Sequence, residues 1–178
     1  MTTALTVERL RNLLQYTPET GVFVWLMKTT NRIRIGETAG STTGENYRKI
    51  QINGKNYGAH RLAWLYMTGE WPPHEVDHRD NKRSNNCWDN LRSATHSLNQ
   101  ANALRPRNNT SGFKGVSLVK HTNRWRARIR ANNRTFHLGC FATAKGAHAA
   151  YVEAAKRFFG EFASGGVEWS EPKQEQAA

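Results

Sequence analysis

The chain has 178 residues, a length that allows one domain or two small ones, and a formal net charge of +12 from 26 Lys and Arg against 14 Asp and Glu. Its two cysteines, Cys87 and Cys140, exclude a zinc site of three or four thiolates and a disulfide framework. No apolar run reaches membrane-spanning length and no secretory signal opens the chain, so we expect an intracellular protein without a membrane partner.

The first half of the chain is expected to alternate short helices and strands. In chain order these are a helix over 7–14, a turn over 17–21, a strand over 22–26, a polar loop to 46, a hairpin of 47–52 and 55–59, and a helix over 60–68. Thr6 can cap the first helix, Asn53-Gly54 is a strong two-residue hairpin turn, and Gly69 can end the second helix.

The next thirty residues predict two strands, 75–78 and 91–94, separated by a polar loop over 79–89. Thr95 can cap a helix that runs to about Ala103. This strand, loop, strand and helix segment contains too few apolar residues to form a core alone, so it must pack on the elements before it.

The last part of the chain predicts three strands and one helix. The strands are expected at 113–119, 124–130 and 135–138, and an Ala-rich helix at 143–159. The expected domains are 1–103, with a core at about 74–103, a linker over 104–112, a second domain over 113–163, and a disordered tail over 164–178.

Positive charge is concentrated in one region of the sequence. Between Asn90 and Val152 lie eleven Lys or Arg and no acidic residue. A field of one sign repels itself and is relieved by a polyanion, most simply a chain of phosphates. We therefore expect a nucleic-acid partner; a basic surface that is merely solvated is the alternative.

Four polar residues stand at intervals that suit phosphodiester hydrolysis. Asn90 follows His78 by twelve residues, and Asn99 follows Asn90 by nine. The reaction needs a base for the water and a cation for the charge on phosphate. The oxygens of Asp77 and Asn99 suit Mg²⁺ (or Mn²⁺), which leaves His78 as the base. Taken singly, these residues are equally typical of turns, helix caps and surface hydrogen bonds.

Residues 5 to 103 resemble the phage-type HNH endonucleases found among homing endonucleases. The matching segments are Pro18-Glu19-Thr20-Gly21, His60-Arg61-Leu62-Ala63, Val76-Asp77-His78, Asn81-Lys82, Asn85-Asn86, Asn90-Leu91 and Asn99. The resemblance implies a ββα-metal fold in which His78 is the general base and Asn90 pins the loop that orients it. It also implies that Asp77 and Asn99 bind one divalent ion per chain.

One position departs from the usual pattern of that family, because Asn99 stands where His is often found. His96, three residues earlier, is therefore a second candidate for a metal ligand or a phosphate contact. Arg92 is a further accessory candidate. We expect His60 to be structural or to contact phosphate at the start of its helix.

The expected strand 124–130 carries four arginines on one face. Arg124, Arg126, Arg128 and Arg130 alternate with Trp125, Ala127 and Ile129, so the two sets face opposite sides of the sheet. Adjacent guanidinium groups on one face are unfavourable without anions, and in a major groove they can bond guanine or phosphate. The apolar face is free to pack on the Ala-rich helix.

Residues 111 to 163 resemble the AP2 DNA-binding domain of plant ethylene-response regulators. The matching segments are Gly112-Phe113-Lys114-Gly115-Val116, Trp125, Ile129-Arg130, Leu138-Gly139-Cys140-Phe141, Thr143-Ala144 and Ala149-Ala150-Tyr151. The resemblance implies a three-stranded sheet that reads the major groove. The expected DNA contacts are Lys114, Ser117, His121, Arg124, Arg126, Arg128, Arg130, Arg134, Thr135 and His137. Several of these differ from the plant residues, so the resemblance implies the docking mode but not the recognised bases. A basic three-stranded domain that binds DNA without sequence preference is the alternative.

Together these patterns predict an α+β protein in which an HNH nuclease module precedes an AP2-like sheet packed on one helix. The expected activity is cleavage of double-stranded DNA by a monomer without an obligate protein partner. We expect a homing-type enzyme of phage origin that acts in the cytoplasm of the bacterial host. A non-cleaving DNA-binding regulator with a vestigial HNH module is the alternative. RNA binding is a third, disfavoured because the Arg-lined face lacks stacking aromatics.

Overall fold

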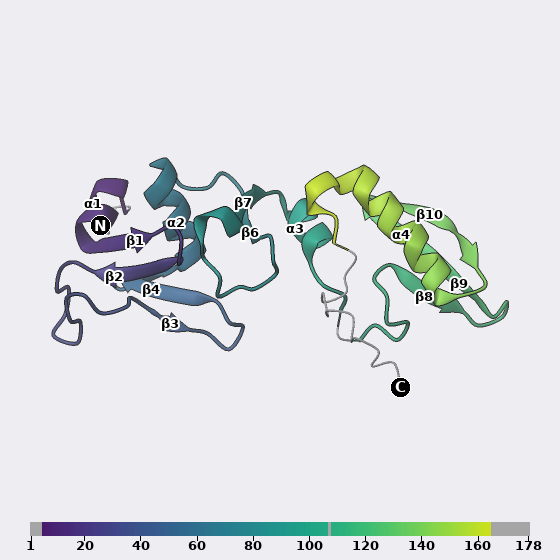
Figure 1. The fold of residues 1–178 in the computed structure, drawn as a ribbon, viewed down its shortest axis with the longest axis horizontal. Coiled ribbons are helices and arrows are strands. Elements are labelled where there is room, and N and C mark those ends of the chain that lie inside the picture. Colours follow the sequence, from purple (N-terminus) through teal and green to yellow (C-terminus); the bar gives the residue numbers. More distant parts are fainter. Residues whose placement is uncertain (1–4, 107, 165–178) are drawn as a thin grey trace, which may run out of the picture. The chain divides into compact units, whose positions relative to one another are not determined.

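The computed structural model describes residues 5–106 and 108–164, which form two compact units (Figure 1). The first ends at His96 and the second begins at Ser97. Both are mixed α/β, as expected. No helix in these residues is long and apolar enough to cross a membrane. Apart from Ser164, the predicted disordered tail lies outside the described residues.

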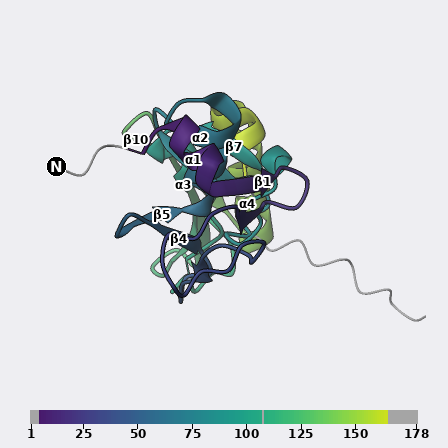
Figure 2. The same cartoon turned by 90° about the vertical axis from the view of Figure 1, so that its left-hand side faces the viewer.

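The first unit consists of two helices and three small antiparallel sheets. Its elements are α1 (Val7–Leu13), β1 (Leu14–Thr17), β2 (Val22–Trp25), β3 (Ser41–Thr42), β4 (Arg48–Ile52), β5 (Lys55–Gly58), α2 (Ala59–Thr68), β6 (Glu75–His78), a 3₁₀ turn (Trp88–Asn90) and β7 (Leu91–Ala94). The sheets pair β1 with β2, β3 with β4 and β5, and β6 with β7. Figure 2 shows α1 beside α2, which pack together.

Local sequence accounts for most boundaries in this unit. The Thr6 hydroxyl accepts a hydrogen bond from the Arg9 N–H at 3.2 Å and caps α1. Gly69 ends α2 in the left-handed conformation at φ 84°. The strand β1 was not predicted: Leu14, expected on the helix, instead opens β1 opposite Trp25. Both side chains are buried there, so tertiary pairing overrides the helical spacing.

The core of the first unit gives the β6–β7 pair the support that its own sequence lacks. Val76 and Leu91 are buried among apolar side chains from α1, α2 and the N-terminal sheets. Antiparallel pairing sets Asp77 opposite Arg92 and His78 opposite Leu91. The core therefore fixes β6 and β7, and with them the polar residues at their ends.

The second unit is a three-stranded antiparallel sheet covered by one helix, as predicted. Its elements are most of α3 (His96–Asn102), β8 (Val116–Val119), β9 (Arg124–Ala131), β10 (Arg134–Phe141), α4 (Ala144–Phe159) and a 3₁₀ turn (Gly160–Phe162). β9 is the central strand and α4 packs on the sheet (Figure 1). The alternation is confirmed, because Ala127 and Ile129 are buried while Arg128 and Arg130 are exposed.

Two strand lengths differ from expectation for local reasons. β8 begins at Val116 rather than 113, because the backbone of Phe113 bonds to the side chains of Ser111 and Asn109. β10 extends to Phe141, past a register shift between His137 and Gly139 that absorbs one residue.

Gly115 permits the close packing of β8 and α4. Its φ is +72°, and a Cβ there would lie 2.2 Å from the Tyr151 ring and 2.6 Å from the Arg128 carbonyl oxygen. A larger residue at this position would therefore be strained and would also push the helix from the sheet.

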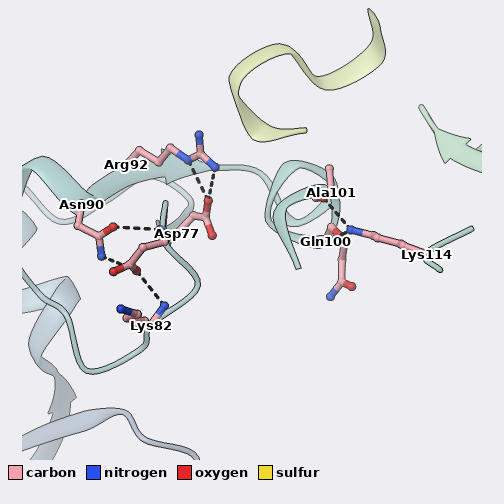
Figure 3. Close-up of polar contacts among 8 residues, drawn as sticks. Asp77, Lys82, Asn90, Arg92, Gln100, Ala101 and Lys114 are labelled. Carbon is pink, nitrogen blue, oxygen red and sulfur yellow. Dashed lines mark hydrogen bonds and ion pairs between the residues drawn. The ribbon is translucent and has the colours of Figure 1, made fainter. Parts of the chain in front are cut away.

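The division between the units falls inside α3 rather than after residue 103. The Lys114 ammonium donates to the carbonyl oxygens of Gln100 and Ala101 at 3.1 and 2.7 Å (Figure 3). It also donates to the carbonyl oxygen of Ala103 at 2.6 Å. These carbonyls end a helix and lack intrahelical partners, so a cation there is favourable. Burial lowers the pKa of Lys114 to about 8. Lys114 thus joins the last turn of α3 to the second unit.

Replacing Lys114 by Met should destabilise the second unit by roughly 2–3 kcal/mol, because three charge-assisted hydrogen bonds are lost and carbonyls are left unpaired. Hydrogen exchange of the β9 amides reports this unit specifically. The control Lys120→Met, at an exposed lysine after β8, should leave exchange unchanged. Equal protection in Lys114→Met and the wild type would contradict the role assigned to Lys114.

Candidate active site

His78 lies at the end of β6 and is buried, with 5% of its surface exposed. Its Nε2 is 3.2 Å from the carboxamide oxygen of Asn86, which is also buried. Because that oxygen can only accept, Nε2 carries the proton and the lone pair of the neutral ring is on Nδ1. Burial lowers the pKa of His78, so the ring is neutral at pH 7. A neutral, oriented imidazole has the state that a general base requires.

Asn90 closes the loop that connects β6 to β7. Its carboxamide oxygen accepts from the Asp80 N–H at 3.1 Å, and its amide nitrogen donates to Asp80 Oδ1 at 2.9 Å and to the Asn85 carbonyl at 2.8 Å. Figure 3 shows Asn90 directed at the start of the loop. One side chain thus ties both ends and the middle of a segment that has little regular structure.

Asp80 is the acceptor at the centre of the same loop. It also accepts from the Lys82 N–H at 2.8 Å and from Asn85 Nδ2 at 2.7 Å. Burial acts to raise the pKa of Asp80, but the hydrogen bonds from Asn85, Lys82 and Asn90, together with His78, lower it overall. The loop is therefore built around a carboxylate that stays ionised.

The N-terminal hairpin holds the loop from outside. The Tyr16 hydroxyl donates to the Asn86 carbonyl at 2.7 Å, and the Trp88 N–H donates to the Pro18 carbonyl at 2.8 Å. Gly21, at φ +70°, lies so close that a Cβ would be 2.3 Å from the Asn86 carbonyl carbon. The turn over 17–21 therefore supports the residue that orients His78.

Asp77, the predicted metal ligand, is buried and paired with Arg92. Both Nε and Nη2 of Arg92 lie 2.9 Å from Asp77 Oδ2, and the two side chains are 5% and 7% exposed (Figure 3). A metal at Asp77 would share the carboxylate with this guanidinium. Arg92, an accessory candidate in the sequence, is thus the partner of Asp77.

Asn99 and His96 are placed differently from each other. His96 lies 2.8 Å from Glu75 through Nδ1; the His96 side chain is exposed and that of Glu75 is partly buried. Asn99 is partly buried in α3, on the second-unit side of the division. Among residues 5–106 and 108–164, no group of three or more His, Cys, Asp or Glu could hold a metal ion. Asp77 and Asn99 as a ligand pair stay a prediction.

His60 begins α2 and packs against His78, with ring centroids 5.3 Å apart. Its Nδ1 is buried and has no hydrogen-bond partner within the described residues. Burial, followed by the nearby His78 and Arg61, lowers the pKa of His60 to about 4. His60 is therefore neutral at pH 7 and acts as an uncharged wall beside His78.

The structure places most of the predicted DNA contacts on one face of the second sheet. Pairing sets Ser117 opposite Arg126, Thr135 opposite Arg130 and His137 opposite Arg128, so all share the arginine face. Exposed members are Arg124, Arg128, Arg130, Thr135 and His137, with His121 in the turn after β8. Ser117 and Arg126 are partly buried, and Ser117 Oγ and Arg126 Nε lack partners in the described part of the chain.

Two predicted DNA contacts do not lie on that face. Arg134 is exposed but pairs with Ala131, whose side chain is buried toward α4, so the register directs Arg134 to the other side of the sheet. Lys114 uses its three ammonium donors on the α3 carbonyls. The arginine face is therefore narrower than the sequence suggested.

Several residues that build the site were not assigned roles from the sequence. Asp80 and Asn86 anchor the loop and His78, and the spacing of Asn85-Asn86 was the available signal. Tyr47, whose ring centroid lies 6.1 Å from that of His78, gave no signal because it precedes β4 by one residue and is far from the loop in sequence.

One segment of the chain is similar to known nucleases. Residues 57–101 match the model of an HNH endonuclease family. Protein 3.8 of Escherichia phage T7 is 36% identical over 76 residues, which cover 42% of this chain and 63% of that protein. A solved structure of DNA binding and cleavage by the HNH homing endonuclease I-HmuI matches with 25% identity and a TM-score of 0.42 over 55% of each chain.

Residues 57–101 are therefore similar to an HNH endonuclease family. The chain spans less than two thirds of the phage relative and about half of the solved structure.

The pKa of His60 predicts a pH-dependent loss of stability. Below its ordinary value of 6.5 the unfolded chain binds a proton that the folded ring rejects until about pH 4, so stability falls as the pH drops through that window. The shift corresponds to about 3 kcal/mol. Urea unfolding at pH 7 and pH 4.5 should show a smaller loss in His60→Phe than in the wild type. Equal losses would contradict the burial of an unprotonated His60.

Proposed function

We propose that this protein is a DNA endonuclease that hydrolyses phosphodiester bonds with His78 as general base. The observation that carries the proposal is the buried, neutral His78, held through Nε2 in a loop that Asn90 closes. Nδ1 would take a proton from the attacking water while the bond from phosphorus to the 3′ oxygen breaks. The leaving oxygen takes a proton from solvent, which gives 5′-phosphate and 3′-hydroxyl ends.

The expected metal ligands have the donor types that a divalent cation prefers. Asp77 and Asn99 offer a carboxylate and a carboxamide oxygen, which suit Mg²⁺ (or Mn²⁺) better than a softer metal. When bound, such an ion would neutralise charge on the phosphate and the leaving oxygen. The role of Asn90 is to keep the loop closed so that His78 stays oriented.

The second unit would direct the nuclease to double-stranded DNA as an AP2-like domain. Support comes from the exposed side chains of Arg124, Arg128 and Arg130 on one face of β9, with buried Ala127 and Ile129 on the other. A rigid basic face of this kind fits a major groove. The phage relative supports a phage or phage-derived origin. We propose a homing-type enzyme that acts as a monomer and, with one site per chain, nicks one strand.

A non-cleaving DNA-binding regulator is the second candidate. It is favoured by the Asp77–Arg92 ion pair, since both guanidinium bonds go to the carboxylate that a metal would need. In that case the arginine face would bind DNA and the HNH domain would serve as a scaffold. Cleavage assays separate the two candidates directly.

Replacing His78 by Ala should lower cleavage by at least about 100-fold and leave DNA binding nearly unchanged, because only the base is removed. The assay follows conversion of supercoiled phage DNA to nicked circles with Mg²⁺ or with EDTA. His74→Ala, at an exposed histidine four residues earlier, is the matched control and should cleave normally. If the wild type retards DNA in a gel but cuts none with any divalent metal, the regulator is supported instead.

Replacing Arg128 and Arg130 together by Ala should weaken DNA binding and reduce the slope of log Kd against log salt by about 2, one counterion for each lost phosphate contact. The control replaces Lys156 and Arg157 together by Ala. Both are exposed in the last turn of α4, so this variant removes the same charge from another surface. Its salt slope should stay near the wild-type value. Equal slopes for both double variants would exclude the arginine face as the DNA contact.

A further inference from the structure

The rings of Tyr47, His60 and His78 form a cluster around the proposed base. The Tyr47 ring centroid lies 5.4 Å from that of His60 and 6.1 Å from that of His78. His60 and His78 are in edge contact at 5.3 Å. Tyr47 immediately precedes β4, so a segment far from the β6–β7 pair in sequence contributes to the site.

Arg83 lies over this cluster. Its guanidinium carbon is 4.8 Å from the centroid of the Tyr47 ring, well within the range of a cation–π contact. Arg83 belongs to the loop between His78 and Asn90, which is closed by the hydrogen bonds described above. A side chain that would otherwise move with an exposed loop is thus held against a fixed ring.

The contact of Arg83 with Glu45 is weak. One Nη is 3.8 Å from an oxygen of Glu45, and the two side chains are 49% and 78% exposed. An ion pair this exposed contributes little and exchanges readily. A guanidinium carries its N–H groups in its own plane, where a planar or tetrahedral anion can accept two of them.

Arg83 and the proposed base contact the same ring. Tyr47 lies against both the Arg83 guanidinium and the His78 ring. A phosphate at His78 would therefore meet a cation with available donors.

We infer that Arg83 is a catalytic residue that binds a non-bridging oxygen of the scissile phosphate, with Tyr47 as its platform and Glu45 as the partner it leaves. The inference rests on the proposed nuclease function. As water adds to phosphorus, negative charge grows on the non-bridging oxygens, and a positioned guanidinium stabilises it. Arg83 exchanges no proton, so the atoms and electrons of hydrolysis balance as described for His78.

The adjacent Lys82 provides a matched control for Arg83. It carries the same charge in the same loop and is exposed, while its backbone N–H binds Asp80. Lys82→Gln removes one charge from the loop without touching the Tyr47 contact. Any effect of charge alone on DNA binding should appear equally in Lys82→Gln and Arg83→Gln.

The test measures the rate of single-turnover nicking of supercoiled phage DNA at saturating protein. The Kd for DNA is measured separately by gel retardation in the presence of EDTA. Arg83→Gln should slow nicking by about 100-fold and change the Kd by less than about threefold, since the contact tightens in the transition state. Arg83→Lys should recover part of the rate. Lys82→Gln should remain within about threefold of the wild type.

Variants of the platform separate stacking from folding. Tyr47→Phe keeps the ring and should nick at nearly the wild-type rate, whereas Tyr47→Ala should lose rate as Arg83→Gln does. Glu45→Gln should not slow nicking. Thermal unfolding of each variant checks that the unit is folded. If Arg83→Gln nicks normally while His78→Ala is inactive, the inference is overturned and the nuclease function stands. The same conclusion follows if Arg83→Gln and Lys82→Gln lose nicking rate equally.

If the wild type does not cut DNA, the proposed nuclease function is wrong. A second measurement, which does not depend on cleavage, then tests the role of Arg83. Inorganic phosphate is titrated into the full chain while the Arg83 Nε–H and His78 ring signals are followed by NMR. Both signals should move together in the wild type, and the His78 response should weaken at least about fivefold in Arg83→Gln. No movement of the Arg83 signal would overturn the inference.

Discussion

The hydrogen bonds that the Asn90 side chain makes with Asp80 and Asn85 are the constraint on which the site in the first unit depends. They close a polar loop that has no core of its own, using three bonds from one carboxamide. Because the loop is closed, Asn86 can hold Nε2 of His78 and Arg83 can rest on Tyr47. The chemistry therefore depends on side-chain hydrogen bonds more than on regular secondary structure.

The apolar core and the turn over 17–21 supply what the loop cannot. Burial of His78 keeps its ring neutral, and the carbonyl of Pro18 and the hydroxyl of Tyr16 fix the far side of the loop. In the second unit a different device operates, because strand alternation alone separates the arginine face from the face packed on α4. Lys114 then attaches the end of α3 to that unit.

Much of the fold could be predicted from local patterns. The Thr6 cap, the Asn53-Gly54 hairpin, the end of α2 at Gly69 and the alternation of β9 all follow from interactions within a few residues. β1 could not, since its strand form depends on pairing with β2. The same holds for the division inside α3, because Lys114 is more than ten residues from the carbonyls it binds.

The sequence by itself determined the residue types of the site, their order, and the basic face of the second unit, because spacing and alternation are properties of the chain. The tertiary structure alone decided their partners: Arg92 for Asp77, Asn86 for His78, Tyr47 for Arg83, and carbonyls rather than the arginine face for Lys114. The physical reason is that ion pairs, ring contacts and burial join residues far apart in sequence. No local pattern encodes these distances, and they decide which groups are neutral, paired or available to a phosphate.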